Sequence, residues 1–122
     1  MDFIFVALGG GLGACLRYAI SLIPIHGEFP ALTLLTNIFG AIAIGFIAGI
    51  FAESGSSSTN LVLFFKTGVC GGFTTFSTFS LEAYHLFEKS KYAAGTAYVA
   101  LSIVLCLAGV WCGGCLAKII KG

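Results

Sequence analysis

The stretch TGVCGGFTTFSTFSLEAY, residues 67 to 84, decides how this chain is organised. It lies inside the third of four long apolar stretches, yet two adjacent glycines, Gly71 and Gly72, interrupt the apolar residues. Hydroxyl residues follow them closely, among them Thr74, Thr75, Ser77 and Thr78. Glycine lowers helix propensity by about 1 kcal/mol per residue relative to alanine, and hydroxyl side chains compete for backbone hydrogen bonds. The sequence therefore predicts a helix that is broken at this point.

A broken helix at membrane depth needs partners for its free backbone groups. Free carbonyls and amides are tolerated there only where protein, water or an ion satisfies them. Half-helix ends of this kind hold ions in membrane transport proteins. The plainer alternative is a continuous helix that is merely enriched in serine and threonine.

The composition is that of an integral membrane protein. Of the 122 residues, 58% are hydrophobic and 9% are charged, and the mean hydropathy is +1.04. Apolar stretches cover residues of about 2–23, 30–52, 60–87 and 91–118, each long enough to cross a bilayer as a helix. Asp2 stands where a secretory signal would carry a basic residue, so the first stretch is interpreted as a retained span. We expect an all-α membrane protein with one domain, residues 1–122, of four transmembrane helices with a broken third helix.

The cations give no preferred orientation. Four crossings would place Lys66, Lys118 and Lys121 towards one face of the membrane, and Arg17, Lys89 and Lys91 towards the other. Three cations on each side leave no bias of the kind that sets topology. This balance favours dual topology and an antiparallel homodimer, since four short helices enclose little space on their own. A weak or lipid-dependent bias is the alternative.

Glycines recur at four-residue spacing in three of the apolar stretches. The pairs are Gly9 and Gly13, Gly45 and Gly49, and Gly109 and Gly113. Small residues at this spacing let helix backbones approach closely in a membrane. We interpret these glycines as helix-packing positions.

Other functional classes find little support. The net charge of +1 comes from scattered residues, so no nucleic-acid partner is expected. Cys112 and Cys115 have C-x-x-C spacing but no second pair or nearby histidine, which argues against a metal site, a redox site or an enzyme. Glu82 is an acid inside the third stretch, but its place near the end of that stretch favours a structural use.

Polar residues share helix faces in the second and fourth stretches. Thr33 and Asn37 are four apart, and Tyr98, Ser102 and Cys106 continue with the same spacing. Residues four apart lie on one face of a helix. A single such residue often joins helices by a hydrogen bond, but several on two faces indicate a polar track.

Two aromatic rings suggest that the track conducts an anion. Phe76 and Phe79 are three apart and share a helix face. The edge of a phenyl ring is the positive end of its quadrupole. Ring edges would therefore hold an anion weakly, as conduction requires. Paired phenylalanines in a span are nonetheless more often core residues.

Three motifs together resemble the Fluc/CrcB fluoride channel family. They are GGGLGACLRY at 9–18, TLLTNIFG at 33–40 and GGFTTFSTF at 71–79. The resemblance implies a passive, fluoride-selective channel in the plasma membrane that lets fluoride leave the cytoplasm. It also implies an antiparallel dual-topology homodimer with a structural sodium ion at its centre.

The resemblance also assigns residues. It implies that the backbone carbonyls of Gly71 and Thr74 hold sodium, that Phe76 and Phe79 line the fluoride path and that Asn37 donates to the anion. It further implies that Arg17 draws fluoride into an aqueous vestibule. The helix-face pattern adds further track residues: Thr33, Thr75, Thr78, Tyr98 and Ser102.

The main alternative is a small dual-topology multidrug or guanidinium-type cation exporter. Such a protein needs an acidic residue embedded in its first span. No acid lies between Asp2 and Glu28, and a cation in lipid without a counter-charge is costly.

Overall fold

The chain folds as an all-helical membrane protein. The computed structural model describes residues 2–25, 27–52 and 59–122. Three of its helices are long and apolar enough to cross a membrane: α1 (Asp2–Ser21), α2 (Ala31–Phe51) and α6 (Tyr92–Lys121). Their bounds agree with three of the predicted stretches to within three residues. The sequence thus correctly predicted a helical membrane protein with apolar spans.

The remaining apolar stretch is divided into shorter helices. They are α3 (Thr59–Val62), the π-helix η2 (Leu63–Cys70), α4 (Gly71–Phe73) and α5 (Phe76–Glu88). The first three join end to end, whereas Thr74 and Thr75 separate α4 from α5. The predicted stretches leave a connection over 53–59, of which residues 53–58 lie outside the described residues and Thr59 begins α3.

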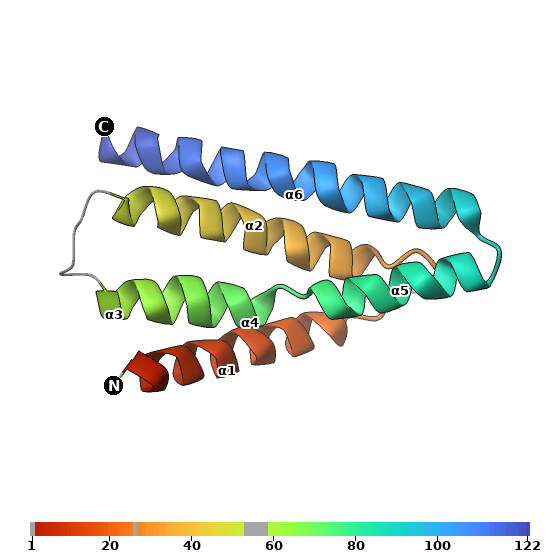
Figure 1. The fold of residues 1–122 in the computed structure, drawn as a ribbon, viewed down its shortest axis with the longest axis horizontal. Coiled ribbons are helices and arrows are strands. Elements are labelled where there is room, and N and C mark those ends of the chain that lie inside the picture. The colour runs from red at the N-terminus through yellow and green to blue at the C-terminus, as the bar shows by residue number, and fades with distance from the viewer. Residues whose placement is uncertain (1, 26, 53–58) are drawn as a thin grey trace.

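The helices run alternately along one long axis. Figure 1 shows the two termini at one end, and the connections from α1 to α2 and from α5 to α6 at the other. Lys91 and Glu28 form an ion pair between these two connections. The ion pair thus links the first half of the chain to the second at this end.

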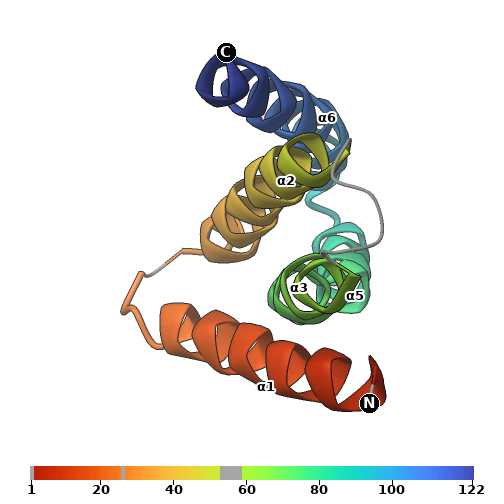
Figure 2. The same cartoon turned by 90° about the vertical axis from the view of Figure 1, so that its left-hand side faces the viewer.

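The helices associate mainly as two rows. In one, α2 packs along α6; in the other, α1 packs along η2 and α4 (Figure 2). Glycines make both approaches possible: a Cβ atom on Gly113 would overlap the carbonyl oxygen of Ile42, and one on Gly13 would overlap that of Val69. The interpretation of these glycines as packing positions is confirmed.

A small apolar core joins α5 to the α2 and α6 row. Leu34 of α2, Ala83 and Leu86 of α5, and Tyr98 of α6 form this buried cluster, with Phe79 packed against it. Because the core lies on the α5 side of Thr74 and Thr75, it holds the interrupted segment against α2.

Candidate functional site

The site begins at the interruption between α4 and α5. Thr74 and Thr75 are both extended, with φ/ψ of −83°/157° and −149°/123°. The backbone N–H and the side-chain hydroxyl of Thr74 both donate to the carbonyl oxygen of Cys70, at 3.0 and 2.9 Å. Thr75 is the N-cap of α5, since its Oγ1 accepts a hydrogen bond from the N–H of Thr78 at 3.2 Å. Thr74 thus satisfies a carbonyl at the end of the helix before the break, and Thr75 caps the helix after it.

Asn37 of α2 fixes the break from the side. Its Nδ2 donates to the carbonyl oxygen of Thr75 at 3.0 Å, and its Oδ1 accepts from the N–H of Thr75 at 2.9 Å. The amide of Asn37 therefore satisfies both backbone groups of the extended Thr75. Because Nδ2 carries two hydrogens, one donor remains after this exchange.

The hydrogen bonds at the break leave two carbonyl oxygens without the N–H donors that a continuous helix would supply. In a continuous helix, the N–H of Thr75 would donate to the oxygen of Gly71, and that of Thr78 to the oxygen of Thr74. Here they donate to Asn37 Oδ1 and Thr75 Oγ1 instead. Gly71 and Thr74 therefore present carbonyl oxygens without their helical partners. Oxygen ligands of this kind suit a hard cation such as sodium.

Arg17 of α1 contacts the short helix α4 just before the break. Its Nε donates to the carbonyl oxygen of Gly72 at 3.3 Å. Arg17 also lines a cavity of about 150 Å³ between α1, α2 and α5. The other residues that line this cavity are Ile20, Ser21, Leu32, Thr33, Thr36, Thr75, Thr78 and Glu82. The guanidinium group of Arg17 therefore lines the same cavity as several hydroxyl side chains.

The carboxylate of Glu82 connects three helices. Its Oε2 accepts a hydrogen bond from Thr33 of α2 at 3.1 Å, and its Oε1 accepts one from Tyr98 of α6 at 3.0 Å. Tyr98 is completely buried. Both carboxylate oxygens thus have hydroxyl donors, and they orient those hydroxyls towards α5.

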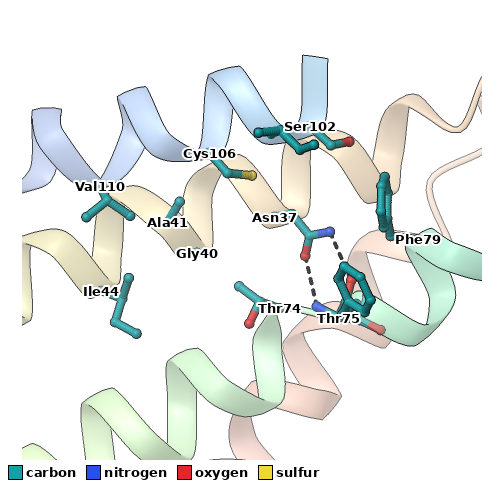
Figure 3. Close-up of a pocket in the computed structure, with 12 residues that line it drawn as sticks. Asn37, Gly40, Ala41, Ile44, Thr74, Thr75, Phe79, Ser102, Cys106 and Val110 are labelled. Carbon is teal, nitrogen blue, oxygen red and sulfur yellow. Dashed lines mark hydrogen bonds between the residues drawn. The ribbon is translucent and has the colours of Figure 1, made fainter. Parts of the chain in front are cut away.

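A larger pocket lies on the other side of the break. It has a volume of about 330 Å³ and opens between α2, α5 and α6 (Figure 3). Its lining includes Asn37, Thr74, Thr75, Phe76, Phe79, Ser102 and Cys106, with apolar residues of α2 and α6 at its other end. Thr75 lines this pocket and the smaller cavity. The extended residue therefore stands between two spaces.

Three aromatic rings form a row beside the larger pocket. The ring centroids of Phe76 and Phe79 are 5.5 Å apart, and those of Phe79 and Tyr98 are 5.1 Å apart. Their planes are tilted by 46° and 52°. Phe79 packs against the core, whereas Phe76 is 79% exposed. The two phenylalanines therefore contact each other but meet different surroundings.

The residues predicted from the sequence divide between the two spaces. Arg17, Thr33 and Thr78 line the smaller cavity; Asn37, Phe76, Phe79 and Ser102 line the larger pocket. Tyr98 lines neither, but it contacts both groups through Glu82 and Phe79. Gly71 is the first residue of the short helix α4, and Thr74, its C-cap, also lines the larger pocket. The structure thus brings these predicted residues to one region.

The sequence favoured a structural use of Glu82 and did not place it beside the predicted track residues. In the structure Glu82 accepts hydrogen bonds from Thr33 and Tyr98 and lines the smaller cavity together with Arg17, Thr33 and Thr78. The signal was present, because Glu82 follows Thr78 by four residues and so shares its helix face. An acid inside a span is a functional candidate by default.

The fold and the site define a multi-pass membrane protein in which two cavities both border the extended Thr75 between α4 and α5, as in a channel or transporter. The chain belongs to the CrcB family. The family model described as "CrcB-like protein, Camphor Resistance (CrcB)" matches residues 4–114.

Relatives from several bacteria match almost the whole chain. A protein of Methylobacterium nodulans is 44% identical over 121 residues, which cover 98% of this chain and 96% of the relative. One of Clostridium novyi is 45% identical over 120 residues, covering 96% and 94%. One of Rhodopseudomonas palustris is 41% identical over 123 residues, covering 98% and 99%. Each of the three is named "Fluoride-specific ion channel FluC", the name of a channel and not of an enzyme.

Proposed function

We propose that this protein is a fluoride-selective channel through which fluoride leaves the cytoplasm across the plasma membrane. Relatives of nearly equal length carry that name. The structural observation that supports it best is the position of Thr75, which lies between two cavities and is held there by Asn37. A passive channel is sufficient when the membrane potential is negative inside, because the potential drives the anion outwards.

The proposed route begins in the smaller cavity. The guanidinium of Arg17 attracts an anion electrostatically, and the hydroxyls of Thr75 and Thr78 are candidate donors to it, whereas the single hydroxyl hydrogen of Thr33 is donated to Glu82. Glu82 would repel an anion by its charge, but both of its oxygens are occupied by Thr33 and Tyr98. We infer that Glu82 holds α2 and α6 against α5 through these two hydrogen bonds and that fluoride passes beside it.

The route continues past Thr75 into the larger pocket. The second hydrogen of Asn37 Nδ2 is the donor that an anion meets there, because the first is held by the carbonyl of Thr75. The rings of Phe76 and Phe79, in contact with each other, then supply electropositive edges. Ser102 offers a hydroxyl on the α6 side. Each of these contacts is weak enough for the anion to move on.

The active unit is proposed to be an antiparallel homodimer with dual topology and four crossings in each chain, the broken segment 59–88 being the third. Two observations support this proposal. The larger pocket is open on one side, where Phe76 and Ile103 are strongly exposed, and a second copy would cover it. The equal number of cations towards the two membrane faces lets both orientations insert.

A sodium ion is proposed as a structural cofactor at the dimer centre. The carbonyl oxygens of Gly71 and Thr74 would hold it, since their helical donors bond to Asn37 and Thr75. Backbone carbonyl oxygens are ligands of the kind that hard cations prefer. The ion would stabilise the broken end of α4.

The exporter alternative is not favoured. It requires an acid in the first span, where α1 carries only Asp2 at its first residue. Glu82 is the acid inside α5, and its carboxylate already accepts two hydrogen bonds. A cation exporter also has no use for phenyl ring edges.

Anion efflux from liposomes that contain only the purified chain tests the proposal. Fluoride and chloride electrodes are read in parallel for the natural protein, Phe76→Ile and Phe79→Ile. We expect rapid fluoride release without chloride release, lost in both variants. Ser80→Ala serves as a control, because Ser80 is exposed on α5 and donates only to the carbonyl of Phe76. Absence of fluoride release from folded, dimeric protein would refute the channel.

A further inference from the structure

Gly72 carries a third backbone carbonyl at the break that has lost its helical donor. In a continuous helix the N–H of Phe76 would donate to the oxygen of Gly72. Phe76 is instead the first residue of α5, after the extended Thr75, and the oxygen of Gly72 accepts a hydrogen bond from Arg17 Nε at 3.3 Å. A side chain of α1 thus takes the place of a backbone donor.

One face of α1 brings Arg17 to this oxygen. Gly9, Gly13 and Arg17 follow one another at four-residue spacing, so they share a helix face. A Cβ atom on Gly9 would overlap the carbonyl oxygen of Phe64, and one on Gly13 would lie 2.8 Å from the nitrogen of Phe73. The backbone of α1 therefore touches η2 and α4 along this face as far as the turn before Arg17. The half-buried arginine side chain then extends from the same face to the break.

Gly72 is itself the close contact of α4 with α1. A Cβ atom on Gly72 would overlap the carbonyl oxygen of Gly10, whereas one on Gly71 meets nothing within 4 Å. Gly72 is therefore held by α1 in two ways, by backbone contact with Gly10 and by the hydrogen bond from Arg17.

We propose that Arg17 is a positioning residue of the break, which fixes the end of α4 through its Nε. This role is distinct from the attraction of an anion by the charge of Arg17, and it uses a different nitrogen. A guanidinium has five N–H donors, of which Nε carries one. The donors on the two terminal nitrogens remain for the smaller cavity, which Arg17 lines.

The position of Gly72 determines where the extended residues lie. Thr75 follows three residues later and borders both cavities, and its exchange with Asn37 requires that its backbone face α2. Loss of the Arg17 donor would free the carbonyl of Gly72 and let this segment move away from Asn37. The effect on fluoride rests on the proposed function, because it requires that the two cavities form the route.

Two substitutions of Arg17 separate the donor from the charge. Lysine keeps the positive charge, but a methylene group stands where arginine has Nε. Glutamine removes the charge, but its side-chain amide can present an N–H donor at the position of Nε. Lys118→Gln is the control, since Lys118 is exposed on α6 and lines neither cavity.

The first experiment measures the break without reference to transport. Hydrogen–deuterium exchange of the purified full chain in detergent is followed by mass spectrometry in peptides that cover 71–78, with peptides of α2 and α6 for comparison. We expect Arg17→Lys to speed exchange several-fold in 71–78 alone, and Arg17→Gln and Lys118→Gln to leave it unchanged. Natural exchange in Arg17→Lys, an equal rise in Arg17→Lys and Arg17→Gln, or a rise spread over all helices would each overturn the positioning role.

The second experiment measures fluoride efflux from liposomes at low and high ionic strength, because salt screens the attraction of a charge. We expect Arg17→Lys to slow efflux several-fold at both ionic strengths and to keep the salt dependence of the natural protein. Efflux through Arg17→Gln should depend less on salt, and Lys118→Gln should behave like the natural protein. Natural efflux in Arg17→Lys would overturn the inference that the Nε contact serves the route. Absence of efflux from the natural protein would count against the channel alone, and the exchange rates would still decide whether Arg17 positions the break.

Discussion

Asn37 and Thr75 exchange two hydrogen bonds, one in each direction, between a side-chain amide on α2 and the backbone of the break. The two residues are 38 positions apart in the chain. The amide of Asn37 thus substitutes for a turn of helix, and it leaves the carbonyl oxygen of Gly71 without its helical donor.

Asn37→Asp should destabilise the break. The substitution keeps an acceptor for the N–H of Thr75 but places a second oxygen against its carbonyl, where Nδ2 now donates. Loss of one buried hydrogen bond with an unsatisfied group costs about 1–3 kcal/mol. We expect the free energy of unfolding in detergent to fall by that amount, and fluoride efflux to fall with it. Asn60→Asp is the control, because Asn60 is exposed on α3; equal effects of the two variants would contradict the role of the exchange.

Glu82→Gln should slow fluoride efflux by about tenfold or more. The side-chain amide of glutamine has one oxygen and one nitrogen, so either Thr33 or Tyr98 loses the oxygen that accepts its hydrogen bond, and α2 or α6 loses a link to α5 beside the route. A hydrogen bond to a charged group contributes about 1.5–3 kcal/mol, and each 1.4 kcal/mol of barrier is about tenfold in rate. Electrode-monitored efflux measures the effect.

Glu88→Gln is the comparison for Glu82→Gln, since Glu88 is exposed at the last residue of α5. It should leave efflux near that of the natural protein. If both variants conduct like the natural protein, the two hydrogen bonds of Glu82 do not hold the route in its conducting shape.

Gly113→Ala and Gly114→Ala should have opposite effects on stability. A Cβ atom on Gly113 would overlap the carbonyl oxygen of Ile42 and lie 2.7 Å from the nitrogen of Phe46, whereas one on Gly114 meets nothing within 4 Å. Overpacking of this kind costs about 1–3 kcal/mol, while alanine favours the helix by about 1 kcal/mol over glycine. Thermal unfolding followed by circular dichroism should show a lower midpoint for Gly113→Ala and an equal or higher one for Gly114→Ala. Similar midpoints would contradict the close packing of α2 on α6.

Sodium should raise the thermal midpoint of the purified protein. A ligand that binds only the folded state stabilises it in proportion to the logarithm of its concentration. We expect sodium chloride to raise the midpoint more than N-methylglucamine chloride at equal ionic strength. Asn37→Leu should abolish the difference, because the N–H of Thr75 is then free to donate to the carbonyl of Gly71. An equal response to both salts in the natural protein would refute the sodium site.

Much of the molecule follows from local sequence. Length and hydropathy predicted α1, α2 and α6, because a helix must satisfy its own backbone in lipid whatever its neighbours are. The glycine spacing predicted close packing between helices, since only small residues permit such an approach, but it did not predict that α2 packs on α6. Gly71, Gly72 and the hydroxyls after them predicted an interruption in the third stretch, because propensity and side-chain competition act within a few residues.

Only the tertiary structure decided how the polar groups are partnered. Periodicity placed Thr33 and Tyr98 on helix faces but did not show that both bind Glu82, or that Asn37 uses one donor on Thr75. It also did not show that Thr75 separates two cavities. These relationships join residues on different helices, and they depend on how far each helix is rotated and shifted against the next. Helix rotation and shift are set by packing over the whole bundle, whereas spacing within one helix determines only which of its residues share a face.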